Sequence, residues 1–145
     1  MSRELVSHPD GGTIFALVAG VSNSKITIHQ GPIILRVGTA QKFGLEHIWA
    51  RHGIALRQIG YQQKVDIPRY VADLLQPGTS VLLQLGTQWE RKRLLAIRGA
   101  LGIAVLEEQE IRNLGIGYSV VTAYLAPRPG GQAVTRLLPR SATSS

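Results

Sequence analysis

The segment GLEHIWARHG, residues 44–53, gathers side chains that can exchange protons and hold anions. It contains His47, Arg51 and His52, and so two of the chain's four histidines. Imidazole titrates near neutral pH, and a guanidinium can bind a phosphate and stabilise the negative charge that develops on it. These groups suit RNA cleavage without a metal, which needs a base for the ribose 2′-hydroxyl, a cation for the phosphate and an acid for the leaving 5′-oxygen.

The spacing of these residues separates their roles if the segment is a helix. His47 and Arg51 are one turn apart and can face one ligand, whereas His52 falls in the apolar sector with Ile48 and Trp49. The two histidines are about 140° apart around the helix axis, which disfavours a helical two-histidine zinc site. We therefore expect no metal or other cofactor. The alternative is a solvated His–Arg pair beside a buried core histidine.

The run GYSVVTAYL, residues 117–125, contributes hydroxyl groups. Strand alternation predicts that Tyr118, Thr122 and Tyr124 share one face, while Ser119 belongs to an otherwise apolar face. Thr122 and Tyr124 are candidates to orient or protonate the reacting groups, and Tyr118 offers a ring on which a base could stack. The alternative is that these residues are simply good strand formers on a half-exposed surface.

Cations and an aromatic ring precede that run. Trp89, Arg93 and Arg98 are candidate substrate-binding residues, because nucleic-acid surfaces combine positive charge with stacking rings. The alternative is a charged strand entry that discourages edge pairing. The whole chain has 16 Lys and Arg against 9 Asp and Glu, a net charge of +7. Such an excess is typical of proteins that bind polyanions, although an acidic protein partner would also fit.

Length and composition predict one folded domain. The chain has 145 residues, and it has no cysteine, which excludes disulfides and thiolate sites. The apolar run at residues 14–21 is too short for a membrane helix, and its flanks lack the basic region of a signal peptide. We expect no membrane segment, so that an exported form would need another segment or a partner to carry the address.

The chain is expected to divide into a flexible tail at residues 1–12, a domain at residues 13–126 and a flexible tail at residues 127–145. Short apolar runs at residues 13–37 predict a β-arm. Helical spacing predicts one helix over residues 42–52, stopped by Gly53, and a second from Pro68 to the Pro77–Gly78 break.

Four runs of period two between residues 80 and 125 predict a four-stranded antiparallel meander. A single long helix over residues 94–111 is the competing interpretation, weakened by Gly99 and Gly102. The order of elements predicts an α+β fold, with an N-terminal β-arm and helices packed on a four-stranded antiparallel twisted sheet.

The helical GLEHIWARHG segment followed by strands that end in GYSVVTAYL resembles the superfamily of small nucleases that groups barnase, EndoU, colicin-type and RelE-like ribonucleases. It is most similar to the C-terminal toxin domains of contact-dependent growth inhibition proteins and to related phage nucleases. The matching residues are His-Ile-x-x-Arg-His at 47–52 and Val-Thr-x-Tyr at 121–124, within a resemblance over residues 35–126. The run ERKRLLAIRG departs from the expected pattern, which leaves the mid-sheet contributor open between Arg93 and Arg98.

The resemblance implies a metal-independent endoribonuclease that cleaves RNA, commonly tRNA, and leaves a 2′,3′-cyclic phosphate. It implies a toxin of interbacterial competition, secreted or displayed as part of a larger protein, active in the target-cell cytoplasm and neutralised by a cognate acidic immunity protein. The expected catalytic residues are His47, Arg51, His52, Thr122 and Tyr124. The alternatives are a non-catalytic nucleic-acid-binding module, with Trp89, Tyr118 and Tyr124 as stacking platforms, and a domain whose basic face docks an acidic protein.

Overall fold

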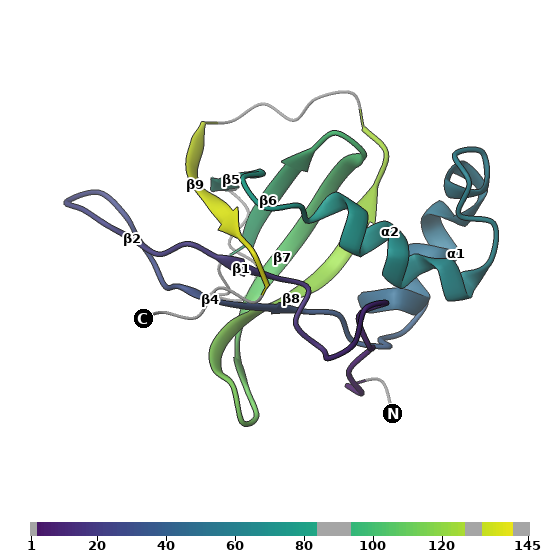
Figure 1. Ribbon diagram of the computed structural model, residues 1–145, viewed down its shortest axis with the longest axis horizontal. Helices are drawn as coiled ribbons and strands as arrows, with labels where there is room; N and C mark the ends of the chain where they lie inside the picture. Colours follow the sequence, from purple (N-terminus) through teal and green to yellow (C-terminus); the bar gives the residue numbers. More distant parts are fainter. Residues whose placement is uncertain (1–2, 84–93, 127–131, 141–145) are drawn as a thin grey trace.

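The computed structural model describes residues 3–83, 94–126 and 132–140. Within these residues, seven strands close into a barrel in the order β1-β4-β8-β7-β6-β5-β9 (Figure 1). These strands are β1 (Ala16–Val18), β4 (Gly31–Ile34), β5 (Ser80–Leu83), β6 (Leu94–Gly99), β7 (Gly102–Ile111), β8 (Gly115–Tyr124) and β9 (Ala133–Leu138). The short strands β2 (Val21–Ser22) and β3 (Thr27–Ile28) form a separate hairpin. Helices α1 (Gly44–Arg57) and α2 (Ile67–Leu74), with the 3-10 turn η1 (Lys64–Asp66) between them, lie on one side of the barrel (Figure 1).

The predicted α+β fold on a four-stranded sheet is wrong, because the structure is a closed mixed barrel with two short helices. Strands β5 to β8 pair in sequence order and antiparallel. However, β8 also pairs in parallel with β4, β5 pairs with β9, and β1 joins β4 to β9. An open meander would leave the edges of β5 and β8 without partners, and barrel closure satisfies both edges. The segment expected to be a β-arm thus contributes barrel strands.

Both expected tails hold ordered segments. β9 lies within residues 127–145, and its Leu137 is 1% exposed. Near the other end of the chain, the amide of Val6 donates to the carbonyl of Leu35 at 2.8 Å, and Leu5 forms a β-bridge with Arg36. The residues that pair with these two segments lie tens of residues away or more in the sequence, so the local composition of the tails does not predict the pairing.

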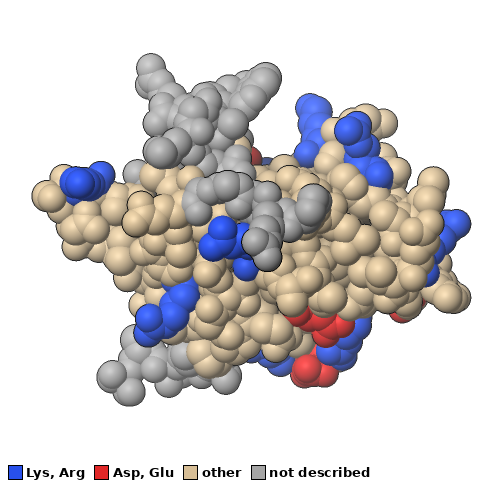
Figure 2. Space-filling view, turned by 90° about the horizontal axis from the view of Figure 1, so that it is seen from above, with Lys and Arg blue, Asp and Glu red and all other residues tan. Residues whose placement is uncertain are grey.

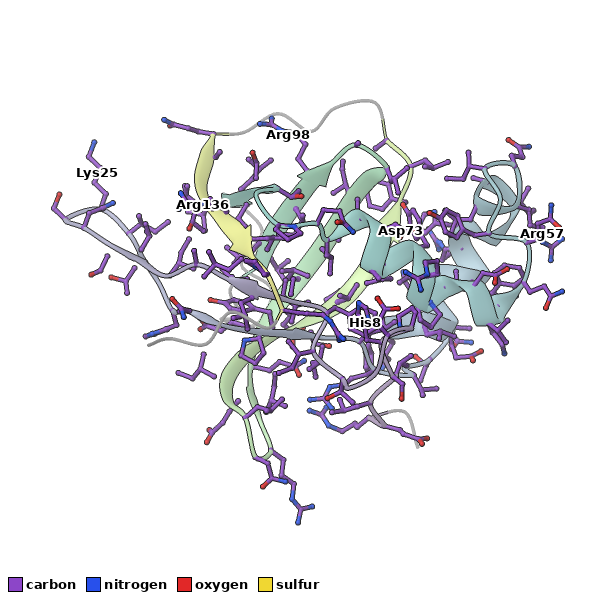
Figure 3. The ribbon with its side chains drawn as sticks, viewed as in Figure 1. His8, Lys25, Arg57, Asp73, Arg98 and Arg136 are labelled. Atoms are coloured by element: carbon purple, nitrogen blue, oxygen red, sulfur yellow. The ribbon has the colours of Figure 1, made fainter. Side chains whose placement is uncertain are left out.

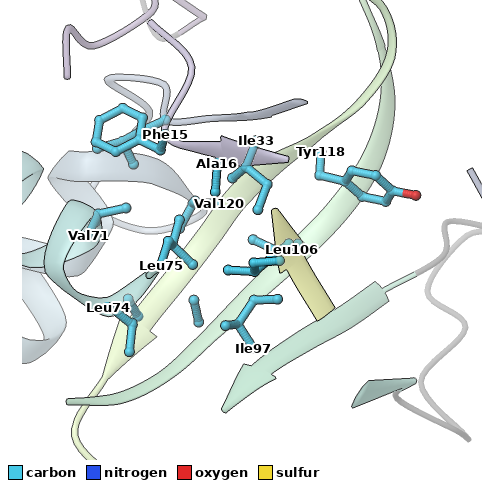
Figure 4. Packing of buried hydrophobic residues seen from close by; sticks show 14 of the residues in the cluster. Phe15, Ala16, Ile33, Val71, Leu74, Leu75, Ile97, Leu106, Tyr118 and Val120 are labelled. Carbon is cyan, nitrogen blue, oxygen red and sulfur yellow. The ribbon is translucent and has the colours of Figure 1, made fainter. Parts of the chain in front are cut away.

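The main core fills the barrel and the space between the barrel and the helices (Figure 4). Ile97 and Leu106 enter it from neighbouring strands, and Val71 and Leu74 enter it from α2. Full burial of one such aliphatic side chain stabilises the fold by about 1.5–3 kcal/mol. Packing against α2 therefore stabilises the barrel and fixes the position of this helix.

α1 is longer than predicted, and Gly53 does not end it. A Cβ on Gly53 would lie 3.0 Å from the ring of Trp49, so this position accommodates an indole one turn away. The start predicted at Pro68 lies within the first turn of α2. The single long helix considered for residues 94–111 is instead two antiparallel strands, joined at Gly99 and Gly102, and Gly102 has a φ of +133°.

Candidate active site

The site forms where α1 runs beside the last half of β8. β4 pairs with β8 only at Tyr118 and Ser119, so α1 can contact β8 further along. The ring of His52 stacks on the ring of Tyr124, with centroids 5.2 Å apart and an interplanar angle of 28°. The rings of His47 and His52 meet edge to face with centroids 6.5 Å apart. Folding thus places His52 against the end of β8, with His47 next to it.

The environment of His52 favours its neutral form. Burial lowers the pKa of His52 below its usual value of 6.5, and the positive charges of His47 and Arg51 lower it further. A neutral imidazole can accept a proton, so His52 has the protonation state that a general base requires. His47 lies in the same helix, with Nδ1 3.1 Å from the carbonyl oxygen of Ala40.

A β-bulge decides which hydroxyl groups reach this site. Leu106 pairs with Val120, whereas Val105 pairs with Thr122, so Val121 is an extra residue on β8. Strict alternation therefore breaks at the bulge. Tyr118 and Val120 point into the main core, while Thr122 and Tyr124 lie on the opposite, outer face.

The prediction that Tyr118 belongs to the substrate surface is therefore wrong. Its side chain is fully buried, and its hydroxyl donates a hydrogen bond of 2.6 Å to the carbonyl of His29. A ring in that position contributes to the core and cannot stack on a base. The reason is the bulge, which a periodicity argument does not detect.

Thr122 remains a candidate site residue because the position of its hydroxyl group destabilises the fold. Its Oγ1 is shielded from solvent and has no hydrogen-bond partner in the described part of the chain. A shielded polar atom without a partner loses its hydration energy, and functional sites are one setting in which such atoms occur. Thr122 lies two residues from Tyr124 on the same face, and the ring of Tyr124 stacks on that of His52.

The candidate cationic residues Arg51 and Arg98 lie at different distances from the histidines. Arg51 is exposed and one helical turn from His47. Arg98 on β6 is opposite Ile103, which is opposite Tyr124, and directly opposed residues share a face. Two strand spacings of about 4.8 Å separate the Arg98 and Tyr124 backbones. Trp89 and Arg93 fall outside the described residues.

Two further residues continue that row and were missed by sequence reasoning. Ser80 on β5 pairs with Arg98, and Arg136 on β9 pairs with Ser80. Figure 3 shows Arg98 and Arg136 on the side of the barrel where β6 and β9 lie. Arg136 is exposed. No local signal could reveal this row, because it depends on the register of strands β5, β6 and β9.

The wider surface agrees with a polyanionic ligand. In Figure 2 basic side chains are spread across the face in view, whereas acidic side chains are confined to small areas. An open depression of about 250 Å³ lies next to Tyr124, lined by Ala100, Leu101, Gly102, Leu125 and Ala126. None of these five lining residues carries a titratable group.

Comparison of the chain with protein-family models, with curated proteins and with solved structures returned no match. In the described ranges, His, Asp and Glu side chains form no group of three that could hold a metal ion. No helix there is both long and apolar enough to cross a membrane.

Proposed function

We propose that the chain is a metal-independent endoribonuclease whose active site lies between α1 and the end of β8. The observation that carries this proposal is the position of His52, stacked on Tyr124 and 6.5 Å from His47. Two imidazoles at this separation, one held neutral by burial, can serve as a base and an acid on opposite sides of one phosphate.

The reaction follows from these assignments. His52 removes the proton from a ribose 2′-hydroxyl, and the 2′-oxygen attacks the adjacent phosphorus. The bond from phosphorus to the 5′-oxygen breaks, and protonated His47 gives its proton to that leaving oxygen. The products are a 2′,3′-cyclic phosphate and a free 5′-hydroxyl. Arg51 stabilises the charge on the phosphate oxygens.

The remaining residues orient the substrate. Tyr124 holds the ring of His52 in place, and Thr122 offers a hydroxyl beside it. Arg98 binds a neighbouring phosphate, because it shares a face with Tyr124. Support for tRNA as the substrate, for a toxin role in interbacterial competition and for an acidic immunity protein comes from the resemblance of residues 47–52 and 121–124 to toxin nucleases. The same resemblance supports delivery of the chain to a target-cell cytoplasm as part of a larger protein.

Cleavage of total tRNA in the presence of EDTA tests this function. We expect His52→Ala and His47→Ala each to reduce cleavage about 10²- to 10⁴-fold, the usual contribution of a positioned acid or base. His29→Ala is the matched control because His29 is exposed at the β3–β4 connection. Circular dichroism of each variant separates loss of chemistry from loss of folding. Full activity in both site variants would refute the assignment.

A non-catalytic nucleic-acid-binding module is the second candidate. It is favoured by the row of Arg136, Ser80 and Arg98, which could bind phosphates without any chemistry. In that case RNA would remain intact in the same assay, while binding would weaken steeply with added salt.

A further inference from the structure

The turn between β4 and α1 is built to hold its backbone in one place. Thr39 and Phe43 form an antiparallel bridge, and the Thr39 amide donates to the Phe43 carbonyl at 2.9 Å. Gly38 and Gly44 flank it with φ of +72° and +86°, in the left-handed region that favours glycine. A Cβ on Gly38 would collide with the Phe43 carbonyl.

This turn is also attached to the first turn of α1. The N-cap residue Phe43 provides no side-chain cap. Instead, the amides of Leu45 and Glu46 donate to the carbonyls of Arg36 and Val37, each at 2.9 Å. These bonds satisfy donors that the helix itself leaves free, so the turn and the helix form one unit.

The Ala40 carbonyl projects from this unit toward His47. Its oxygen lies 3.1 Å from Nδ1 of the imidazole. A carbonyl oxygen can only accept a hydrogen bond, so Nδ1 must carry a proton for this contact to be favourable. In the neutral ring Nε2 then has no proton, and in the charged ring Nε2 carries the exchangeable one.

We propose that the Ala40 carbonyl is a positioning group that keeps a proton on Nδ1 of His47 and makes Nε2 the atom that exchanges a proton with substrate. The inference rests on the proposed ribonuclease function only for its consequence in catalysis. Gly38 acts through the turn, since its positive φ and its lack of a Cβ allow the backbone path that places this carbonyl. After each turnover His47 can regain a proton only at Nε2, so the acidic proton is always on the same atom.

Nitrogen NMR of the ¹⁵N-labelled protein tests the tautomer directly. In neutral His47 we expect a pyrrole-type signal for Nδ1 and a pyridine-type signal for Nε2. Gly38→Ala should shift the ring toward a mixture of tautomers and lower kcat for RNA cleavage, by up to about 10²-fold if the acid is misplaced. Gly60→Ala is the matched control: Gly60 also has a positive φ, +108°, but a Cβ there meets nothing within 4 Å.

Each result decides a separate point. A protonated Nε2 with unprotonated Nδ1 in the neutral wild-type protein would overturn the positioning role, whether or not Gly38→Ala folds. An unchanged tautomer in folded Gly38→Ala would overturn the role of the turn. The expected tautomer without any RNA cleavage would support the positioning role and refute the ribonuclease.

Discussion

Mild acid should destabilise this protein because its most buried histidine is held in the neutral form. His8 is 8% exposed, and its Nδ1 accepts a 3.0 Å hydrogen bond from the amide of Asp10, which a protonated Nδ1 could not do. Burial lowers the pKa of His8, and Arg140 lowers it further; Asp10 opposes this shift, and Arg69 adds to it. Protonation would therefore break a bond and place a charge between cations.

The sign and size follow from proton linkage. The unfolded chain binds a proton at His8 near pH 6.5, whereas the folded chain binds it only at lower pH. The contribution of neutral His8 to the free energy of unfolding is therefore full above pH 6.5, and it is lost as the pH falls through the folded pKa. One such group gives a slope of at most about 1.4 kcal/mol per pH unit. His52, whose pKa is also lowered, raises the limit for the wild type to about 2.8 kcal/mol per pH unit.

Urea unfolding between about pH 7.5 and about pH 5.5 measures this slope. We expect His8→Gln to lose about half of the wild-type dependence of the unfolding free energy on pH, even if its stability at neutral pH is lower. His29→Gln is the control, because that side chain is exposed. If His8→Gln retains the full wild-type slope, the neutral buried state assigned to His8 is refuted.

Three further substitutions test the fold around the site. Tyr118→Phe should lower the unfolding free energy by about 1–3 kcal/mol, because the His29 carbonyl loses its donor, and RNA cleavage should be unchanged. A selective loss of cleavage would instead show that Tyr118 contacts the substrate. Gly102→Ala should destabilise by about 1–3 kcal/mol, because its φ is positive and a Cβ would collide with the Tyr124 carbonyl, and thermal unfolding at unchanged midpoint would contradict this. Ile97→Ala should cost about 2–5 kcal/mol in urea unfolding, and a smaller loss would mean that the barrel interior at this position is loosely packed.

Several helices and strands could be predicted from the local sequence pattern. The four runs of period two are strands because their β-branched and aliphatic residues suit a surface buried on one side, and Pro68 lies in the first turn of a helix that starts where expected. The end of α1 could not be predicted from the sequence. Gly53 looked like a helix stop, but the ring of Trp49 packs over it and the helix continues for another turn.

The candidate site divides in the same way. The types and spacing of His47 and His52 indicated proton-transfer chemistry, and the structure stacks the ring of His52 on Tyr124 with the ring of His47 next to it. The bulge at Val121 was invisible in the sequence, since it depends on how β7 pairs with β8. That single extra residue places Tyr118 in the core and leaves Thr122 and Tyr124 outside.

The sequence by itself determined the local elements, the positive charge and the set of groups able to move protons, because these depend on residue type and short-range spacing. Only the tertiary structure decided that the strands close into a barrel, that Arg136 and Arg98 share a row, and that the Ala40 carbonyl faces His47. These features arise from pairing between segments far apart in the chain or from the exact path of a turn. Strand edges of similar composition compete for the same partners, and the choice between them is made by the packing of the whole core.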